Sequence, residues 1–224
     1  MRFTVGSSGN ASAEVNFLPG LDGFSVQTMS GGHGKFSIES GSGTLSDAAL
    51  LETVVLTALD WTFFIGVHAA CVMRQGRSVL LCGDSHAGKS TLAYACVRSG
   101  WKFVSDNSLH WAAAPDDILV SGSASLRLRE GSQALFASET RVVTPLDSSP
   151  TAPTGPFVFL QRRPGPAVLQ PRSLDLAMQY LAVYDTRPDR TYAEERYRSL
   201  LRDGAWTLEY ESVWDAVRCL EALL

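Results

Sequence analysis

The sequence is poor in cysteine, carries no strong excess of either charge and has no uninterrupted apolar run long enough to span a membrane. Its four cysteines among 224 residues show no C-x-x-C spacing, which argues against a disulfide framework or a zinc site and indicates buried thiols in a reducing compartment. The net charge of -4 gives no general footprint for nucleic acid or an anionic membrane. We therefore expect neither as a partner.

The most apolar stretch, Ala48 to Met73, is interrupted by Glu52, Asp60 and His68. Central charges are costly in a bilayer, so this stretch is expected to form a buried helix followed by a core strand. The residues after Met1 lack the apolar segment of a secretory signal. These features together predict a cytoplasmic protein.

One octapeptide, Gly83-Asp84-Ser85-His86-Ala87-Gly88-Lys89-Ser90, fits the Walker A pattern G-x-x-x-x-G-K-[ST]. An apolar strand candidate, Ser78 to Cys82, precedes it, and a helix candidate, Lys89 to Arg98, follows. Glycines allow the backbone N–H groups to turn inward, and the helix N-terminus favours negative charge. The pattern predicts a loop that binds a triphosphate.

In this interpretation each polar group of the loop meets a charge of the ligand. Lys89 reaches the outer phosphates, and the Ser90 hydroxyl is placed to ligate Mg²⁺. The predicted binding set is Gly83, Asp84, Ser85, His86, Ala87, Gly88, Lys89, Ser90 and Thr91.

A second candidate is the carboxylate of Asp106, which ends the apolar strand Trp101 to Ser105 and precedes Asn107. At the C-terminal edge of a strand an ionised oxygen can ligate Mg²⁺ or accept the proton of an attacking hydroxyl. The alternative is ordinary Asp-Asn turn chemistry. His68 stands among apolar residues, where a core histidine is the more common interpretation.

The remaining pattern predicts one domain over residues 1–224, with an N-terminal β meander in 1–45 and a nucleotide-binding core with C-terminal elements in 46–224. A helix is expected after a cap at Ser46 or Asp47. The proline-rich segment Thr144 to Pro156 is expected to be an exposed connector of weak order. Further strands are expected at Val67–Val72, Ser108–Ala112, Ile118–Ser121, Ser125–Leu128, Phe157–Leu160 and Trp206–Tyr210, and helices after Ser173, from Tyr192 to Gly204 and at the C-terminus.

Three segments together resemble the C-terminal catalytic domain of HPr kinase/phosphorylase in order and spacing: Gly66 to Ala70, the octapeptide, and Gly100 to Asn107. A fourth, Ser125 to Gly131, looks like the strand that carries the L-E-I-R-G signature of that family. The resemblance makes His68 a candidate site residue.

The resemblance implies an α/β fold with a P-loop core and a mixed β-sheet, similar to phosphoenolpyruvate carboxykinase and HPr kinase. It implies ATP with Mg²⁺ and transfer of phosphate to a serine hydroxyl of a peptide or small protein, in a possible homo-oligomer. The implied catalytic residues are Asp106 as general base, His68, Lys89, Arg127 and Arg129, and the implied metal ligands are Ser90, Asn107 and Asp106.

The chain departs from the family pattern at Asn107, where the second acid is expected, and at Arg127, where the signature has glutamate. We also expect no counterpart of the separate N-terminal domain of the full-length enzymes within residues 1–224. The chain is thus more similar to short HPr-kinase-related proteins, some of which phosphorylate lasso-peptide precursors. Two alternatives stay open: a nucleotide-binding regulator without transfer activity, and a kinase of a free small molecule such as serine.

Overall fold

The computed structural model describes residues 2–6, 12–17, 23–28, 33–37, 64–113, 117–137, 140–184 and 193–224. Contacts group the chain into two compact units, residues 1–65 with 186–193 and residues 66–185 with 194–224. Each unit is described by itself. The expectation that residues 1–224 act as one domain stays a prediction.

The first unit contains a four-stranded antiparallel sheet in the order β1-β2-β3-β4. The strands are β1 (Arg2–Gly6), β2 (Ser12–Phe17), β3 (Gly23–Thr28) and β4 (His33–Ser37). Each strand pairs with the next one in sequence, so the predicted meander is confirmed. The helix expected after Ser46 lies outside the described residues.

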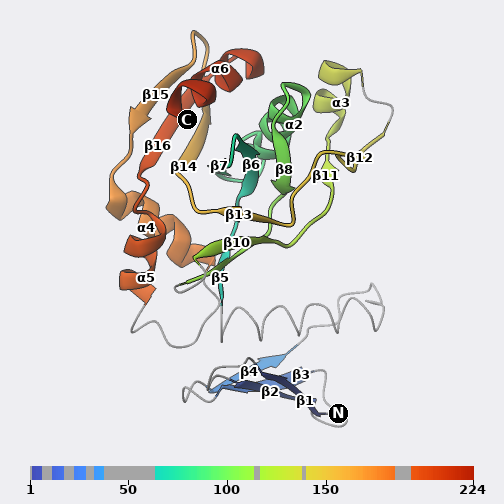
Figure 1. The fold of residues 1–224 in the computed structure, drawn as a ribbon, viewed down its shortest axis with the longest axis vertical. Coiled ribbons are helices and arrows are strands. Elements are labelled where there is room, and N and C mark those ends of the chain that lie inside the picture. Colours follow the sequence, from blue (N-terminus) through green and yellow to red (C-terminus); the bar gives the residue numbers. More distant parts are fainter. Residues whose placement is uncertain are drawn as a thin grey trace. The chain divides into compact units, whose positions relative to one another are not determined.

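The second unit is built on a six-stranded mixed sheet (Figure 1). Its order is β15 (Val168–Pro171), β16 (Ala205–Tyr210), β14 (Phe157–Arg162), β7 (Arg77–Cys82), β6 (Ala70–Arg74) and β8 (Lys102–Ser105). β14 is parallel to β7 and β16, and β6 is antiparallel to β7 and β8. The C-terminal ends of β7, β8, β14 and β16 therefore point the same way, and the expected mixed α/β sheet is confirmed.

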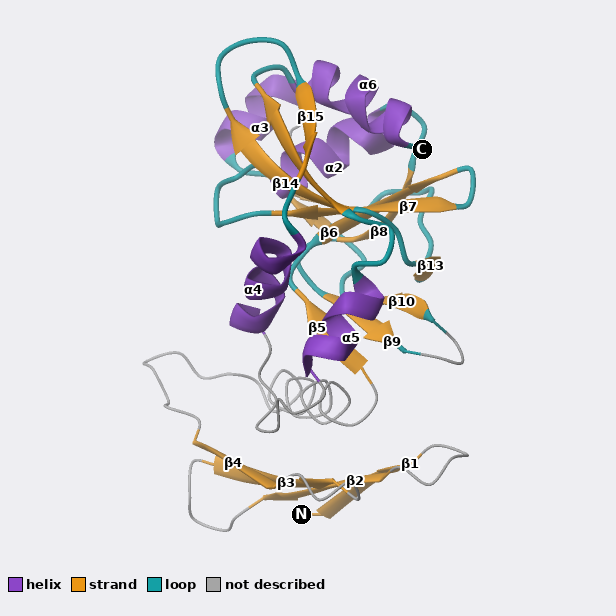
Figure 2. Cartoon of the chain, turned by 90° about the vertical axis from the view of Figure 1, so that its left-hand side faces the viewer, coloured by secondary structure: helices purple, strands orange, loops and turns teal. Residues whose placement is uncertain are grey.

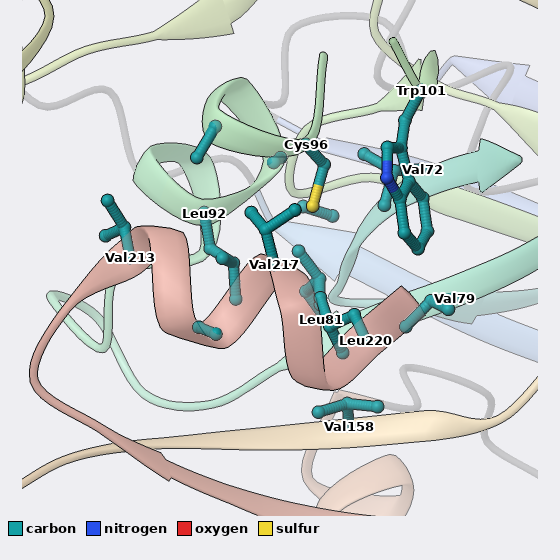
Figure 3. Close-up of a cluster of buried hydrophobic side chains, with 14 of the residues drawn as sticks. Val72, Val79, Leu81, Leu92, Cys96, Trp101, Val158, Val213, Val217 and Leu220 are labelled. Atoms are coloured by element: carbon teal, nitrogen blue, oxygen red, sulfur yellow. The ribbon is translucent and has the colours of Figure 1, made fainter. Parts of the chain in front are cut away.

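Two helices, α2 (Lys89–Arg98) and α6 (Val213–Leu223), pack on one face of this sheet (Figure 2). Their apolar residues recur at spacings of three and four, which gives each helix one apolar stripe. Figure 3 shows Leu92 of α2 and Val217 of α6 above Leu81 of β7. This packing holds α2 against the sheet, and residues 83–88 join the end of β7 to the start of α2.

The rest of the second unit adds a smaller sheet, a two-stranded ribbon and three helices. The smaller sheet has the order β13 (Thr151–Pro153), β10 (Ile118–Ser121), β9 (Leu109–Ala112) and β5 (Phe64–Val67), and the ribbon pairs β11 (Leu126–Arg127) with β12 (Val142–Val143). The helices are α3 (Glu130–Phe136), α4 (Leu174–Tyr184) and α5 (Ala193–Leu200). In Figure 2, α4, β9 and β10 lie on the side of the large sheet away from α2 and α6.

Several sequence predictions need correction. The strand predicted over Val67 to Val72 is two strands, because the chain leaves the smaller sheet after Val67 and enters the larger one at Ala70. An apolar run in the sequence indicates that a segment is buried, but it does not indicate in which sheet the segment lies. In Ser125 to Leu128 only two residues are in a strand, and α3, β12 and β15 were not predicted.

Most residues from Thr144 to Pro150 are exposed, as predicted, but the expectation that Thr144 to Pro156 has weak order is wrong. The backbone of Phe103 donates to Asp147 O at 3.0 Å and accepts from Ser149 N at 2.8 Å. Ser78 Oγ donates to Pro153 O at 2.6 Å. Proline lacks an N–H group but keeps its carbonyl, so a proline-rich segment can still line the edges of two sheets.

The four cysteines are all free, and Cys71, Cys82 and Cys96 are buried, as the sequence predicts. Burial raises the pKa of these three thiols far above the ordinary value. Within the described ranges, no helix is both long enough and apolar enough to cross a membrane.

Leu92→Ala should lower the free energy of unfolding by about 2–5 kcal/mol, because Leu92 is 0% exposed between α2, α6 and the sheet. Leu176→Ala is the matched control, since Leu176 is 48% exposed on α4 and should change stability by less than about 0.5 kcal/mol. Urea unfolding followed by tryptophan fluorescence measures both. Equal effects of the two substitutions would contradict the packing described for α2.

Candidate functional site

The segment that joins β7 to α2, residues 83–88, is called the glycine loop. Gly83 has φ of +138° and Gly88 has φ of +100°, both in the region that favours glycine. A Cβ atom at Gly83 would lie 2.9 Å from Ala87 Cβ, and one at Gly88 would lie 2.8 Å from Tyr210 Oη. Both ends of the loop therefore need glycine for backbone conformation and for space.

Lys89 begins α2 and folds back across the glycine loop. Its Nζ atom donates to Gly83 O at 2.7 Å and to Asp84 O at 3.2 Å. Burial lowers the pKa of Lys89, and the nearby carboxylates of Asp106 and Asp84 oppose that shift. The N-cap residue Gly88 gives the first turn of α2 no side-chain cap, so no capping side chain occupies the first backbone N–H groups of this helix.

Asp106 follows β8 and is hydrogen-bonded to the first turn of α2. Ser90 Oγ lies 2.8 Å from Asp106 Oδ1 and 3.0 Å from Oδ2, and Arg127 N donates to Oδ2 at 3.2 Å. The backbone N–H of Asp106 donates to Ser123 Oγ at 2.8 Å. Residue Asp106 is only 4% exposed, and burial raises the pKa of its carboxyl above 3.8, partly offset by these hydrogen bonds and by Lys89.

His68 lies between β5 and β6, and the structure brings its ring to the same place. The ring stacks on Tyr184 with centroids 4.6 Å apart. Burial and the positive charge of Lys89 lower the pKa of His68, while a hydrogen bond to the backbone of Asn107 raises it. The neutral imidazole is thus favoured in the absence of a ligand.

A tyrosine of α4 joins the His68 segment to the glycine loop. Tyr180 Oη donates to His68 O at 2.8 Å and accepts from Gly83 N at 3.2 Å. Its ring also contacts Phe159 of β14 edge to face, with centroids 5.1 Å apart. One phenol therefore positions two parts of the site.

These groups surround a cavity of about 1040 Å³. Five cationic side chains line it: Lys89, Arg127, Arg129, Arg141 and Arg162. No Asp or Glu is among the described residues that line it, and the Asp106 carboxylate lies beneath, bonded to Ser90. The chain has a net charge of -4, so this local positive charge indicates an anionic ligand.

The structure brings most of the predicted site residues to this cavity. The predicted residues that line it are His68, Ser85, His86, Gly88, Lys89, Ser90, Thr91, Asn107, Arg127 and Arg129. Gly83, Asp84 and Ala87 shape the glycine loop behind the lining, and Asp106 supports Ser90. Asn107 has φ of +69°, a conformation that asparagine tolerates better than most residues.

Sequence reasoning missed Arg141, Arg162, Tyr180 and Tyr184. Arg162 ends β14, and its guanidinium lies over the Tyr210 ring at 4.6 Å and donates to Glu211 O at 2.8 Å. It is thereby held beside Gly88. The sequence signal that could have found Arg162 is its place near the end of a predicted strand. Only the parallel pairing of β14 with β7 shows that this end of the strand adjoins the glycine loop.

No family model and no curated protein matches the chain in sequence. Among solved structures, it is similar to the Hpr(Ser) kinase/phosphatase from Coxiella burnetii, with 11% identity and a TM-score of 0.44. The match covers 70% of this chain and 87% of that one. A similarity this loose carries no argument about activity, which has to rest on the geometry of the site.

Gly88→Ala should destabilise the protein by about 1–3 kcal/mol, because alanine is strained at positive φ and its Cβ would press on Tyr210 Oη. Adding Tyr210→Phe should recover the steric part but leave the backbone part. Gly131→Ala is the control, since Gly131 lies in α3 without a positive φ, and a methyl group there would have open space within 4 Å. Denaturant titrations compare the variants; a neutral Gly88→Ala would contradict the loop geometry.

Asp106→Asn should change how stability depends on pH. Because the folded pKa of Asp106 is raised, its stabilisation is complete below the ordinary pKa of 3.8 and is lost as the pH rises through the folded pKa. Asparagine does not ionise, so the stability of the variant relative to wild type should increase from about pH 4 towards neutrality. Urea titrations without nucleotide or metal measure this difference. A relative stability that falls over the same interval would show that the shift has the opposite sign.

Proposed function

We propose that the chain is a Mg-ATP-dependent kinase with a P-loop core that transfers the γ-phosphate to a serine-type hydroxyl of a peptide or small protein. The observation that carries this proposal is the convergence of Lys89, Ser90 and Asp106 where β7 passes through the glycine loop into α2. The basic lining of the cavity supports a polyphosphate ligand.

The glycine loop and Lys89 would hold the phosphates. A lysine ammonium has three donor hydrogens, and Lys89 uses two positions on loop carbonyls, which leaves one for a phosphate oxygen. The N-terminal turn of α2 adds backbone donors and a favourable dipole. Arg162, fixed on Tyr210 beside Gly88, adds a second positive charge at this end of the cavity.

The donor set beside the loop fits Mg²⁺. Magnesium prefers hard oxygen ligands and is commonly held by one or two protein groups together with substrate phosphates. Ser90 supplies a hydroxyl, Asn107 an amide oxygen at the cavity wall and Asp106 a carboxylate. When bound there, Mg²⁺ would neutralise charge on the β- and γ-phosphate oxygens.

We assign the general base to Asp106. Its carboxylate accepts the proton of the acceptor hydroxyl while the new O–P bond forms, and the bond from the γ-phosphorus to the bridging oxygen breaks so that ADP leaves with the electron pair. Burial makes this carboxylate a stronger proton acceptor than an exposed one. His68 positions Asn107 through its backbone contact, and Arg127 or Arg129 neutralises charge on the transferred group.

A second candidate is a nucleotide-binding regulator without transfer activity. Asn107 favours it, because a neutral amide stands where a second carboxylate would strengthen metal binding. This candidate shares the nucleotide site with the kinase and differs only in the absence of a phosphorylated acceptor.

Lys89→Ala should reduce kcat/KM about 30- to 1,000-fold, the scale of roughly 2–4 kcal/mol for a lost charge contact in the transition state. Lys102→Ala is the matched control, because Lys102 is exposed on β8 and pairs with Asp147 at 3.5 Å outside the cavity lining. Transfer of label from γ-labelled ATP to serine peptides and small proteins measures turnover. Wild-type activity in Lys89→Ala would remove Lys89 from the mechanism.

Asp106→Asn separates the two candidate functions. A general base is needed for transfer but not for holding the phosphates, so this variant should still bind ATP by calorimetry, with a weaker contribution from Mg²⁺, and should lose turnover. If wild type binds nucleotide but labels none of the acceptors tested, the regulator becomes the better assignment. If wild type binds no nucleotide, the proposal fails as a whole.

A further inference from the structure

Three of the cavity arginines come from one side of α2. Arg127 lies on β11, Arg129 is the N-cap of α3 and Arg141 precedes β12. Figure 1 shows β11, α3 and β12 on one side of α2 and β14, which carries Arg162, on the other. Arg127, Arg129 and Arg141 are called the arginine wall.

The guanidinium groups of the arginine wall have no carboxylate partner in the described part of the chain. Ion pairs there engage Arg74, Arg163, Arg198, Arg202 and Arg218, but none of the three wall residues. Arg129 Nη1 lies 2.7 Å from a ring nitrogen of His86, which is a contact with a side chain of the glycine loop and not with an acid. Three like charges that line one cavity repel each other unless an anion joins them.

The charge of a nucleotide does not account for the whole set. A triphosphate with Mg²⁺ keeps a net charge of about -2, and Lys89 with Arg162 beside the glycine loop already supplies two positive charges. The wall adds three more. A cavity of about 1040 Å³ is also slightly larger than the usual range for a ligand pocket, about 300–1,000 Å³, so it has room for a second ligand.

The wall adjoins the group that we assign as general base. Arg127 N donates to Asp106 Oδ2 at 3.2 Å, so the backbone of one wall residue is hydrogen-bonded directly to that carboxylate. A hydroxyl placed at Asp106 would bring its neighbouring groups towards the wall. The second ligand at this position is therefore the acceptor.

Apolar side chains beside the wall indicate what kind of acceptor fits. Leu135 of α3 and Val142 of β12 are 49% and 53% exposed and line the same cavity. α3 is tied to α2 by the hydrogen bond between Ser132 Oγ and Thr91 Oγ1 at 2.6 Å, so these elements present a defined surface. Guanidinium groups interleaved with apolar side chains match a peptide with acidic and apolar residues better than a second nucleotide.

We infer that the arginine wall binds an acidic acceptor peptide, whose carboxylates flank the phosphorylated hydroxyl and pair with Arg141 and with whichever of Arg127 and Arg129 does not contact the transferred phosphate. This inference rests on the proposed kinase function for the role of the peptide as acceptor. Binding of an acidic peptide to the wall is a separate property that can be measured without nucleotide.

The experiment compares fluorescent serine peptides of equal length, one with aspartate and glutamate next to the serine and one with asparagine and glutamine in their place. Anisotropy titrations are made with and without a non-hydrolysable Mg-ATP analogue. The acidic peptide should bind at least tenfold more tightly to wild type, and raising the salt concentration should weaken its binding. The expected preference reflects charge-assisted hydrogen bonds to guanidinium groups.

Arg141→Gln tests the wall without touching a residue assigned to phosphate transfer. This variant should bind the acidic peptide about tenfold more weakly than wild type, and its affinity for the nucleotide analogue should stay within twofold of the wild-type value. Arg77→Gln is the matched control, because Arg77 is exposed on β7, lies outside the cavity and loses the same charge. In transfer assays, Arg141→Gln should raise KM for the acidic peptide and change kcat little.

Several outcomes would overturn the inference. One is equal affinity of the wild type for the acidic and the amide peptides, and another is unchanged binding of the acidic peptide to Arg141→Gln. A third is a loss of nucleotide affinity in Arg141→Gln as large as its loss of peptide affinity, which would make the wall a phosphate site. Phosphorylation of free serine but of neither peptide would also overturn it and would favour a small-molecule acceptor. A wild-type protein that binds the acidic peptide but no nucleotide would refute the kinase proposal and leave the wall as an acidic-peptide site.

Discussion

The hydrogen bond between Ser90 and Asp106 is the contact on which the arrangement of the site depends. It joins the first turn of α2 to the residue that follows β8, and most of α2 and the whole of β8 lie between Ser90 and Asp106 in sequence. Both ends are rigid, because α2 is packed against α6 and the sheet, and β8 is paired with β6. The hydroxyl and the carboxylate are thus held in place before any ligand arrives, which lowers the ordering cost of binding.

Charge is distributed unevenly between the molecule and its cavity. The chain carries a net charge of -4, yet five cationic side chains converge on one hollow and the nearby carboxylate of Asp106 is buried under Ser90. Field lines in a cleft of one sign are focused by its low-dielectric walls. An anion would therefore be drawn to this cavity.

Local patterns in the sequence predicted the parts of this structure that depend on neighbouring residues. The octapeptide with its flanking strand and helix, the meander and the carboxylate after β8 follow from periodicity and turn chemistry, and the structure has them. The position of Arg162 beside Gly88 depends on the pairing of β14 with β7, which joins residues far apart in sequence, and Arg141 depends on the ribbon of β11 and β12. The proline content of Thr144 to Pro156 led to the wrong expectation of weak order. This segment is held by backbone carbonyl groups, which every residue has, proline included.

The phenol of Tyr180 connects helix α4 to the site. A single oxygen holds the carbonyl of His68 and the amide of Gly83. The segment that carries His68 and the first peptide of the glycine loop thus share one hydrogen-bonding side chain, which comes from the helix on the face of the sheet away from α2 and α6.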